Sequence, residues 1–343
     1  MTVDTVAETP WAAERVIDCH FHERPTLEAM IAHLDGSGVS SALVLAFDDF
    51  EDRYSDSHAE HPGRFAGWAR GPQLIPGERP GAGRNSSAFE MSAALSIVTA
   101  ADTRTALRNL QDQGWKGFAE TVGAVEVDGP ALQRVYALAS ELDVPVMMHF
   151  QEAVVPGQPV YGIRGFSRIE SMLKKYPSTR FVCHAPDFWG GIDSRYRDGG
   201  QYLTDRVSPG GLSDRLLSEY PNMFGDLGAP SALLQLTRDR DFTADFLTRH
   251  SGKLMFGSDC GCADGRGSVE APTPAATELA SGSPFDDIDA ETAAAMQAAM
   301  AAAGGLAGRC IARELLSVIW TTTSRQDFRK LASTNAERIY RLD

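Results

Sequence analysis

The stretch Pro130-Ala-Leu-Gln-Arg-Val-Tyr-Ala-Leu-Ala-Ser-Glu-Leu-Asp-Val-Pro-Val-Met-Met-His149 joins a helical pattern to a strand pattern. Its first part, Pro130 to Leu142, has apolar residues at helical spacing, and its second part, Val144 to His149, is a short apolar run. Such a run is typical of a strand in a parallel sheet, which is buried on both faces. The stretch therefore predicts one unit of an α/β fold.

The same alternation of strand and helix patterns continues on both sides of this stretch. The expected strands are Val16–Asp18, Ala42–Phe47, Phe65–Ala69, Gly117–Glu120, Val144–His149, Thr179–His184, Met223–Leu227 and Leu254–Asp259. The expected helices are Leu27–Ser37, Thr103–Gln113, Pro130–Leu142, Phe166–Tyr176, Leu212–Tyr220 and Phe242–His250. Eight strands with crossover helices predict a (β/α)8 TIM barrel, with an open doubly wound sheet as the alternative.

The length of the chain predicts a single domain with insertions. A minimal barrel takes roughly 250 residues, and this chain has 343. We expect residues 1–15 to form an N-terminal tail and residues 16–343 to form the barrel. Loop-like segments at 71–87, 189–211 and 261–308 follow the third, sixth and eighth strands, so we expect insertions there, at the end of the barrel where enzymes build their sites.

Composition excludes several classes of function. The 32 basic and 46 acidic residues give a net charge of −14, which repels nucleic acids. We find no apolar run long enough for a membrane span and no signal-peptide pattern, so we expect no membrane partner and a cytoplasmic location. The five cysteines are odd in number and scattered, which favours free thiols in a reducing compartment.

The most informative motif is Asp18-Cys-His-Phe-His22. Two histidines separated by one residue on a strand project from the same face, so His20 and His22 can reach one metal ion. A single His-x-His pair is only weak support for a metal site, because such pairs also occur by chance.

Further ligand-type side chains end other expected strands. Glu120 ends the fourth, His149 the fifth, His184 the sixth and Asp259 the eighth. Each residue taken singly is more often structural, as a rim histidine or a helix N-cap. The carboxyl ends of barrel strands meet at one mouth, however, so the set together predicts a shared site for a divalent metal.

With these residues in this order, the sequence resembles the amidohydrolase superfamily, in particular the branch that contains aminocarboxymuconate semialdehyde decarboxylase. The likeness extends from Asp18 to the closing Asn335-Ala-Glu-Arg-Ile-Tyr340. The resemblance implies that the primary metal ligands are His20, His22, His149 and Asp259. It also implies that His184 binds a second metal in two-metal members and acts in catalysis in one-metal members.

The sequence departs from the pattern of that branch at three places. Glu120 stands where many two-metal relatives have a carboxylated lysine, and it can bridge two metals without modification. Ala185-Pro-Asp-Phe-Trp189 replaces the glycine pair that tends to follow the histidine in the decarboxylases, and Cys260-Gly-Cys262 replaces an aromatic-proline step. These departures leave the metal ligands intact and weaken the decarboxylase assignment.

The leading hypothesis is a metal-dependent hydrolase acting on an amide, ester or lactone of a small molecule, with Asp259 as general base and Asp259 or His184 returning the proton. We expect Zn2+ as the ion, with Mn2+ or Fe2+ as alternatives, at one or two ions per chain. The other hypotheses are a metal-dependent non-oxidative decarboxylase of a small aromatic or unsaturated acid and a non-catalytic metal-binding barrel. The sequence does not fix the substrate, and a homo-oligomer stays open.

Side chains near the expected ligands have less specific interpretations. We expect Cys260 and Cys262 to be small buried thiols, because the barrel site already has enough ligands. Aromatic residues beside the ligands can wall a substrate or pack at the rim, and loop arginines can clamp a carboxylate or be solvated. The aromatic residues are Phe21, Phe150, Phe188 and Trp189, the arginines are Arg24, Arg70, Arg164 and Arg195, and the histidines expected to be structural or exposed are His33, His58, His61 and His250.

Overall fold

A computed structural model of the chain describes residues 9–24, 26–46, 50–73, 95–96, 100–152, 162–268 and 308–342. Its strands are β1 Ile17–His22, β2 Ser41–Leu45, β3 Phe65–Ala69, β4 Pro72–Gln73, β5 Leu95–Ser96, β6 Phe118–Thr121, β7 Pro145–His149, β8 Arg180–His184, β9 Met223–Asp226 and β10 Leu254–Met255. Its helices are α1 Leu27–Ser37, α2 Phe50–Glu60, α3 Ala100–Asp112, α4 Pro130–Leu142, η2 Phe166–Arg168, α5 Ile169–Lys175, α6 Pro186–Gly190, α7 Leu212–Glu219, α8 Ala229–Thr237, α9 Arg240–Arg249, α12 Ile311–Thr322, α13 Arg325–Arg329, η3 Lys330–Thr334 and α14 Asn335–Tyr340.

The main strands are all parallel and form two sheets, in the orders β1-β2-β3 and β10-β9-β8-β7-β6. Backbone hydrogen bonds join these sheets on both sides. On one side Lys116 N donates to Trp68 O at 2.8 Å, and on the other Cys19 N donates to Phe256 O at 3.0 Å. The two sheets therefore close into a (β/α)8 TIM barrel, as the alternating pattern predicts.

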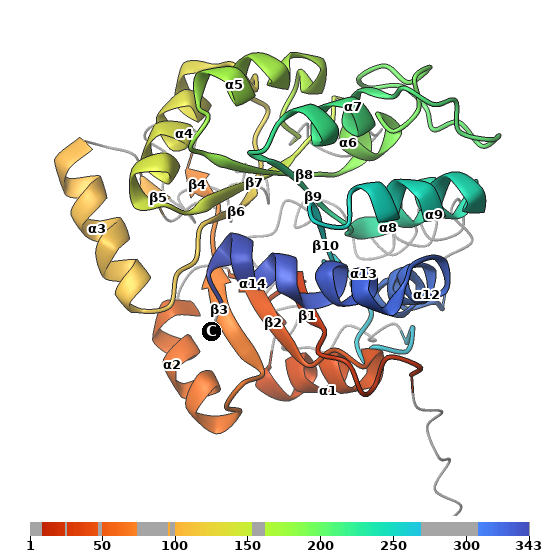
Figure 1. The fold of residues 1–343 in the computed structure, drawn as a ribbon. Coiled ribbons are helices and arrows are strands. Elements are labelled where there is room, and N and C mark those ends of the chain that lie inside the picture. The colour runs from red at the N-terminus through yellow and green to blue at the C-terminus, as the bar shows by residue number, and fades with distance from the viewer. Residues whose placement is uncertain are drawn as a thin grey trace, which may run out of the picture.

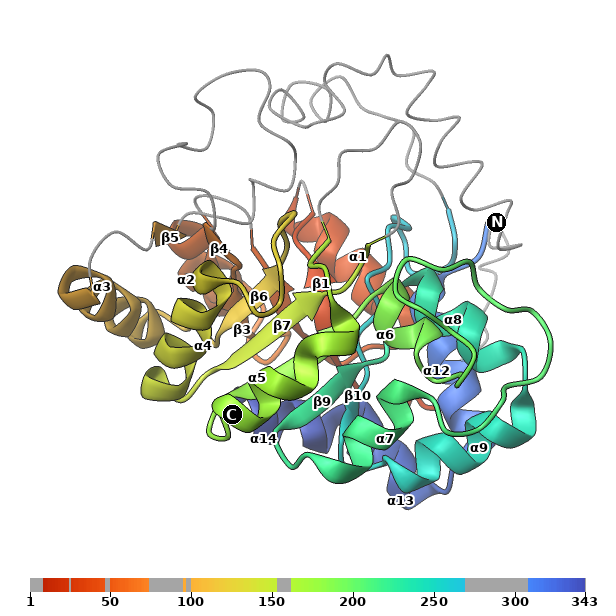
Figure 2. The same cartoon turned by 90° about the horizontal axis from the view of Figure 1, so that it is seen from above.

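Helices surround the strands, with α1, α2, α3, α4, α5, α8 and α9 on the outside (Figure 1). Local sequence sets the limits of α1. The Thr26 side chain accepts a hydrogen bond from Ala29 N at its start, and Gly38 adopts a φ of 72° at its end. Figure 2 shows the same elements after a rotation of 90°, with α13 and α14 at the lower edge of the molecule.

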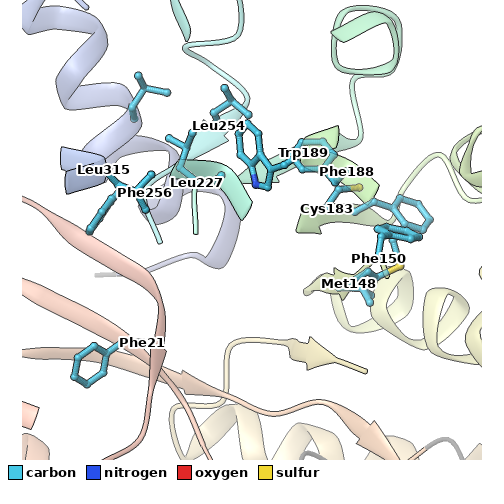
Figure 3. Packing of buried hydrophobic residues seen from close by; sticks show 14 of the residues in the cluster. Phe21, Met148, Phe150, Cys183, Phe188, Trp189, Leu227, Leu254, Phe256 and Leu315 are labelled. Atoms are coloured by element: carbon cyan, nitrogen blue, oxygen red, sulfur yellow. The ribbon is translucent and has the colours of Figure 1, made fainter. Parts of the chain in front are cut away.

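Two apolar layers hold the barrel together. The inner layer consists of side chains inside the barrel, such as Leu43, Met147 and Val182, and it continues into α14 through Ile339 and Tyr340. The outer layer lies between the strands and the helices, where Phe188 and Trp189 pack with ring centroids 5.0 Å apart (Figure 3). Both layers are nearly free of solvent contact, so the strand ends are held on a rigid scaffold.

Most expected elements are present, with different limits at some ends. The first strand extends to His22, and the eighth ends at Met255 rather than Asp259. The sequence patterns missed α2, α6, α8 and the helices from α12 onward, and they missed the short parallel pair β4 and β5.

The expected insertions are described only in part. The segment 189–211 is mostly turns and coil, apart from the end of α6, whereas residues 74–87 and 269–307 lie outside the described residues. The assignment of 1–15 as a tail and of 261–308 as an insertion stays a prediction. None of the helices in the described ranges has the length and apolarity needed to cross a bilayer.

Candidate active site at the carboxyl ends of the strands

An irregularity in β1 directs both histidines of the His-x-His motif into the barrel mouth. The register between β1 and β2 shifts between Asp18 and Phe21. Phe21 packs in the outer apolar layer, whereas His20 and His22 face each other with their Nε2 atoms 3.3 Å apart. His20 is fully buried, and the His22 side chain is 37% exposed, so the site opens to solvent on the His22 side.

Asp259 joins these histidines from the other end of the barrel sequence. Its backbone N–H donates to His20 O at 2.9 Å, and its φ is 46°, a left-handed conformation that is uncommon for a side chain other than glycine. The carboxylate lies 3.2 Å from His22 Nε2, 3.8 Å from His20 Nε2 and 3.6 Å from His184 Nε2. Strand closure between β10 and β1 therefore brings Asp259 among three imidazoles.

Glu120 and His149 complete the opposite side of the site. Glu120 Oε1 lies 2.5 Å from His149 Nδ1 and 3.8 Å from His184 Nε2, and Oε2 lies 3.8 Å from His20 and His22. Period-2 alternation along the strand predicts that Glu120 lies on the same side of the sheet as Phe118, and the structure differs from this prediction. Phe118 packs in the outer layer and Ala119 in the inner one, because the register between β6 and β7 shifts between Phe118 and Thr121.

Asp226 is a functional residue that the sequence patterns missed. It is fully buried at the end of β9, and its Oδ2 lies 2.5 Å from His20 Nδ1 and 2.9 Å from His184 Nδ1. The carboxylate thus faces the Nδ1 atoms of two imidazoles whose Nε2 atoms point to the mouth, and it selects the tautomer of both. The rule used for the other strands, a ligand-type residue at the carboxyl end, would have found it, but the expected strand was extended past it to Leu227.

The charges of the site stabilise one another. Burial alone raises the pKa of Glu120, but His149, His20 and His184 outweigh it and lower that pKa to about 2. Burial lowers the pKa of His184, yet Asp226, Asp259 and Glu120 raise it to about 10. The pKa of Asp259 likewise falls well below its usual value despite burial, because of His20, His184 and His22. The carboxylates are therefore ionised and face a cationic environment.

The donor set fits a divalent metal. Ligand atoms within 4.8 Å of one another occur in three overlapping groups, namely His20, His184 and Asp259; His20, His22 and Glu120; and Glu120, His149 and His184. Imidazole and carboxylate are the usual ligands of Zn2+ and related ions, at about 2.0 to 2.2 Å. Because the groups share members, the arrangement has room for one ion or for two neighbouring ions. All six residues expected from the sequence are thus brought together, while their roles as ligands stay predictions.

Most of the remaining side chains singled out in the sequence pack or pair elsewhere, whereas Arg70 is buried directly after β3 with its guanidinium 5.4 Å from the centre of the Trp68 ring. Phe21, Phe150, Phe188 and Trp189 are buried in the outer apolar layer, which supports the packing interpretation over a substrate wall. Three of the loop arginines have partners elsewhere: Arg24 donates to Cys260 O at 2.8 Å, Arg164 pairs with Glu126, and Arg195 pairs with Asp193 and Asp205.

Several solved structures are similar to this chain. The chain is similar to IDCase from Metarhizium anisopliae, with 10% identity over 96% of this chain and 98% of that one and a TM-score of 0.50. It is also similar to a probable 2-pyrone-4,6-dicarboxylic acid hydrolase from Acinetobacter baumannii, with 11% identity, coverage of 96% and 100%, and a TM-score of 0.48. A third similar structure is an amidohydrolase from Burkholderia multivorans with bound Zn, with 12% identity, coverage of 96% and 100%, and a TM-score of 0.44.

At 10% identity the likeness to IDCase concerns the fold alone, and the two structures with TM-scores below 0.5 carry no argument. A search of the curated proteins gives no match. The family model described as amidohydrolase matches residues 17–342, which is almost the whole chain. The chain therefore belongs to the amidohydrolase family and is an enzyme of the amidohydrolase superfamily.

Proposed function

We propose that this enzyme is a metal-dependent hydrolase that activates water for attack on an amide, ester or lactone of a small molecule. The observation that carries the proposal is the position of Asp259, whose carboxylate lies 3.2 to 3.8 Å from the Nε2 atoms of three histidines. A carboxylate that is ionised, partly open to solvent and surrounded by metal-ligand side chains has the properties of a general base.

His20, His22, His149 and Asp259 would hold a first ion, and His184 and Glu120 are in reach of a second. A divalent ion, proposed to be Zn2+ with Mn2+ or Fe2+ as alternatives, supplies Lewis acidity and lowers the pKa of water to about 7.

The protein's own groups carry the proton steps. Asp259 accepts the proton of the attacking water, because its carboxylate is partly open to solvent and lies among the metal-ligand side chains. When His184 does not bind a second ion, it returns the proton to the leaving group, since Asp226, Asp259 and Glu120 raise its pKa against the effect of burial. Asp226 holds the imidazoles of His20 and His184 in place through their Nδ1 atoms.

A non-oxidative decarboxylase on the same scaffold is the second candidate function. Such an enzyme needs a cationic clamp for the substrate carboxylate, which arginine provides best. Arg24, Arg164 and Arg195 are bonded to other groups of the protein and do not support it, which leaves Arg70, buried directly after β3, as the candidate clamp. The ionised Asp259 favours activation of water.

The test is a parallel screen of the metal-loaded enzyme and Asp259→Asn. We expect hydrolysis of at least one amide, ester or lactone by the wild type, no carbon dioxide release from aromatic or unsaturated acids, and loss of turnover with much of the metal retained in the variant. Carbon dioxide release without hydrolysis would support the decarboxylase, and inactivity towards every substrate would favour a binding protein. Activity of Asp259→Asn above a tenth of wild type would remove Asp259 from the role of base.

A further inference from the structure

A second cluster of metal-ligand side chains lies outside the barrel mouth. It consists of His33 on α1, Cys260 and Cys262 after β10, and Cys310 at the N-cap of α12, and we call it the Cys3His cluster. Its four ligand atoms all lie within 4.8 Å of one another. Cys260 Sγ is 3.4 Å from Cys262 Sγ and 3.8 Å from Cys310 Sγ, and Cys262 Sγ is 3.6 Å from His33 Nδ1.

These distances match a tetrahedral zinc site. Zn–S bonds of about 2.3 Å and Zn–N bonds of about 2.0 to 2.1 Å place two sulfurs about 3.8 Å apart and a sulfur and nitrogen about 3.6 Å apart. Three cysteines and one histidine are also one of the ligand sets found in structural zinc sites. We propose that His33, Cys260, Cys262 and Cys310 bind a zinc ion distinct from the ions of the barrel mouth.

A disulfide fits the cluster less well than a zinc ion does. The sulfur separations exceed the 2.05 Å of a disulfide bond, and a disulfide would leave one cysteine over. The fully buried His33 Nε2 has no hydrogen-bond partner among the described residues with zinc on Nδ1 or without it, so it does not distinguish zinc from free thiols. His33 Nδ1 lies 2.9 Å from Cys262 O and 3.6 Å from Cys262 Sγ, and it can bind zinc in the tautomer that carries its proton on Nε2.

The surroundings of the cluster are suited to thiolates. The partly buried Arg24 donates to Cys260 O at 2.8 Å, so a guanidinium group lies beside the sulfurs. A Cβ added at Gly36 of α1 would lie 1.8 Å from Asp264 O, so the chain after Cys262 is pressed against α1. The cysteine-bearing turn is therefore held next to His33 by backbone contact, independently of the four ligands.

The place of the cluster in the fold indicates a structural role. Four protein ligands fill a tetrahedral ion and leave no position for substrate. The ion would tie α1, the segment after β10 and the start of α12 together. Cys260 directly follows Asp259, so the same ion would fix the backbone of the proposed base, and the ligands Cys262 and Cys310 flank the segment 263–309.

Cobalt substitution of the full-length protein tests the proposal, because it separates the two kinds of site. Co2+ bound by thiolates has intense charge-transfer absorption in the near ultraviolet, which imidazole and carboxylate ligands do not produce. We expect this band in the wild type and in His149→Ala, and its loss in Cys262→Ser and Cys310→Ser. Cys183→Ala is the matched control, since Cys183 is a buried cysteine on β8 outside the cluster, and it should keep the band.

Zinc content provides the second measurement. The wild type and Cys183→Ala should hold about one more zinc ion per chain than Cys310→Ser, and zinc should protect the cluster's thiols from alkylation in the wild type. The wild-type measurements suffice if the cysteine variants do not fold. A folded wild type that lacks the thiolate band, and whose thiols are alkylated equally with and without zinc, would overturn the proposal. A disulfide between two cysteines of the cluster in protein purified under reducing conditions would also overturn it.

Discussion

Replacement of Asp226 by asparagine is the sharpest test of how the barrel mouth is organised. The Asp226 carboxylate accepts from His20 Nδ1 at 2.5 Å and approaches His184 Nδ1 at 2.9 Å, and all three side chains are fully buried. Both contacts are made by Oδ2, so an amide oxygen in its place can still accept from both N–H groups but lacks the negative charge that strengthens these bonds. The substitution therefore weakens the anchor of both imidazoles without changing the volume of the core.

The size of the effect follows from these contacts. Loss of a carboxylate that orients a metal-ligating histidine typically costs 10- to 100-fold in metal affinity or activity. Because Asp226 serves two histidines, we expect a fall of about 100-fold, equivalent to about 2.7 kcal/mol. The amide NH2 would take the place of Oδ1, which has no hydrogen-bond partner among the described residues, so the substitution should also lower the free energy of unfolding by about 1 to 3 kcal/mol.

The assay is metal titration followed by calorimetry, together with denaturant unfolding of the metal-free protein. Asp214→Asn is the control, because Asp214 pairs with His250 Nε2 at 2.6 Å and with Arg249, away from the barrel mouth. The control should lose stability and keep its metal affinity. An Asp226→Asn protein that binds metal within twofold of wild type would refute the proposed orienting role.

Three further predictions concern the bridging carboxylate, acid stability and backbone contact. Elemental analysis should show that Glu120→Gln holds fewer ions than wild type; an unchanged content of one ion per chain would reject bridging. His250 and Arg249 lower the pKa of Asp214 to about 2 against the effect of burial, so the ionised carboxylate stabilises the folded protein by at most about 2 kcal/mol. This contribution should be complete above about pH 4 and be lost as the pH falls through about 2. An acid-unfolding curve equal to that of Asp214→Asn would contradict the prediction. Gly257→Ala should weaken metal binding at least tenfold in the same titration, since its Cβ would lie 2.1 Å from Asp226 Oδ1, whereas Gly252→Ala, in open space, should not.

Sequence patterns predicted the barrel because the strands are short apolar runs that end in ligand-type residues. His149 and His184 end regular strands, so alternation alone directs them to the mouth. Glu120 lies at the mouth as predicted, but it does so because of a register shift between β6 and β7, which no local sequence pattern indicates. Elements such as α8 and α12 were missed because their packing surfaces depend on tertiary contacts.

The limits of sequence reasoning are clearest for residues distant along the chain. Asp226 becomes informative only beside the histidines of β1 and β8. Cys310 and His33 carry no motif that links them to Cys260-x-Cys262, and only the fold brings them together. The spacing of residues along the sequence cannot predict such clusters, because the distances between their side chains depend on how the barrel strands and the outer helices pack in the folded protein.

The hydrogen bonds between β1 and the segment after β10 give the barrel a seam, where Asp259 N donates to His20 O and Asp18 Oδ1 accepts from Ser258 N at 2.8 Å. Two of the proposed metal ligands, His20 and Asp259, lie on opposite sides of this seam. An ion that binds both residues links β1 to the segment after β10, so its affinity depends on the hydrogen bonds that close the barrel. Metal loading would then slow amide exchange at Cys19 and Asp259 more than elsewhere, and a barrel that opens at this seam would lose its ion and its chemistry in the same event.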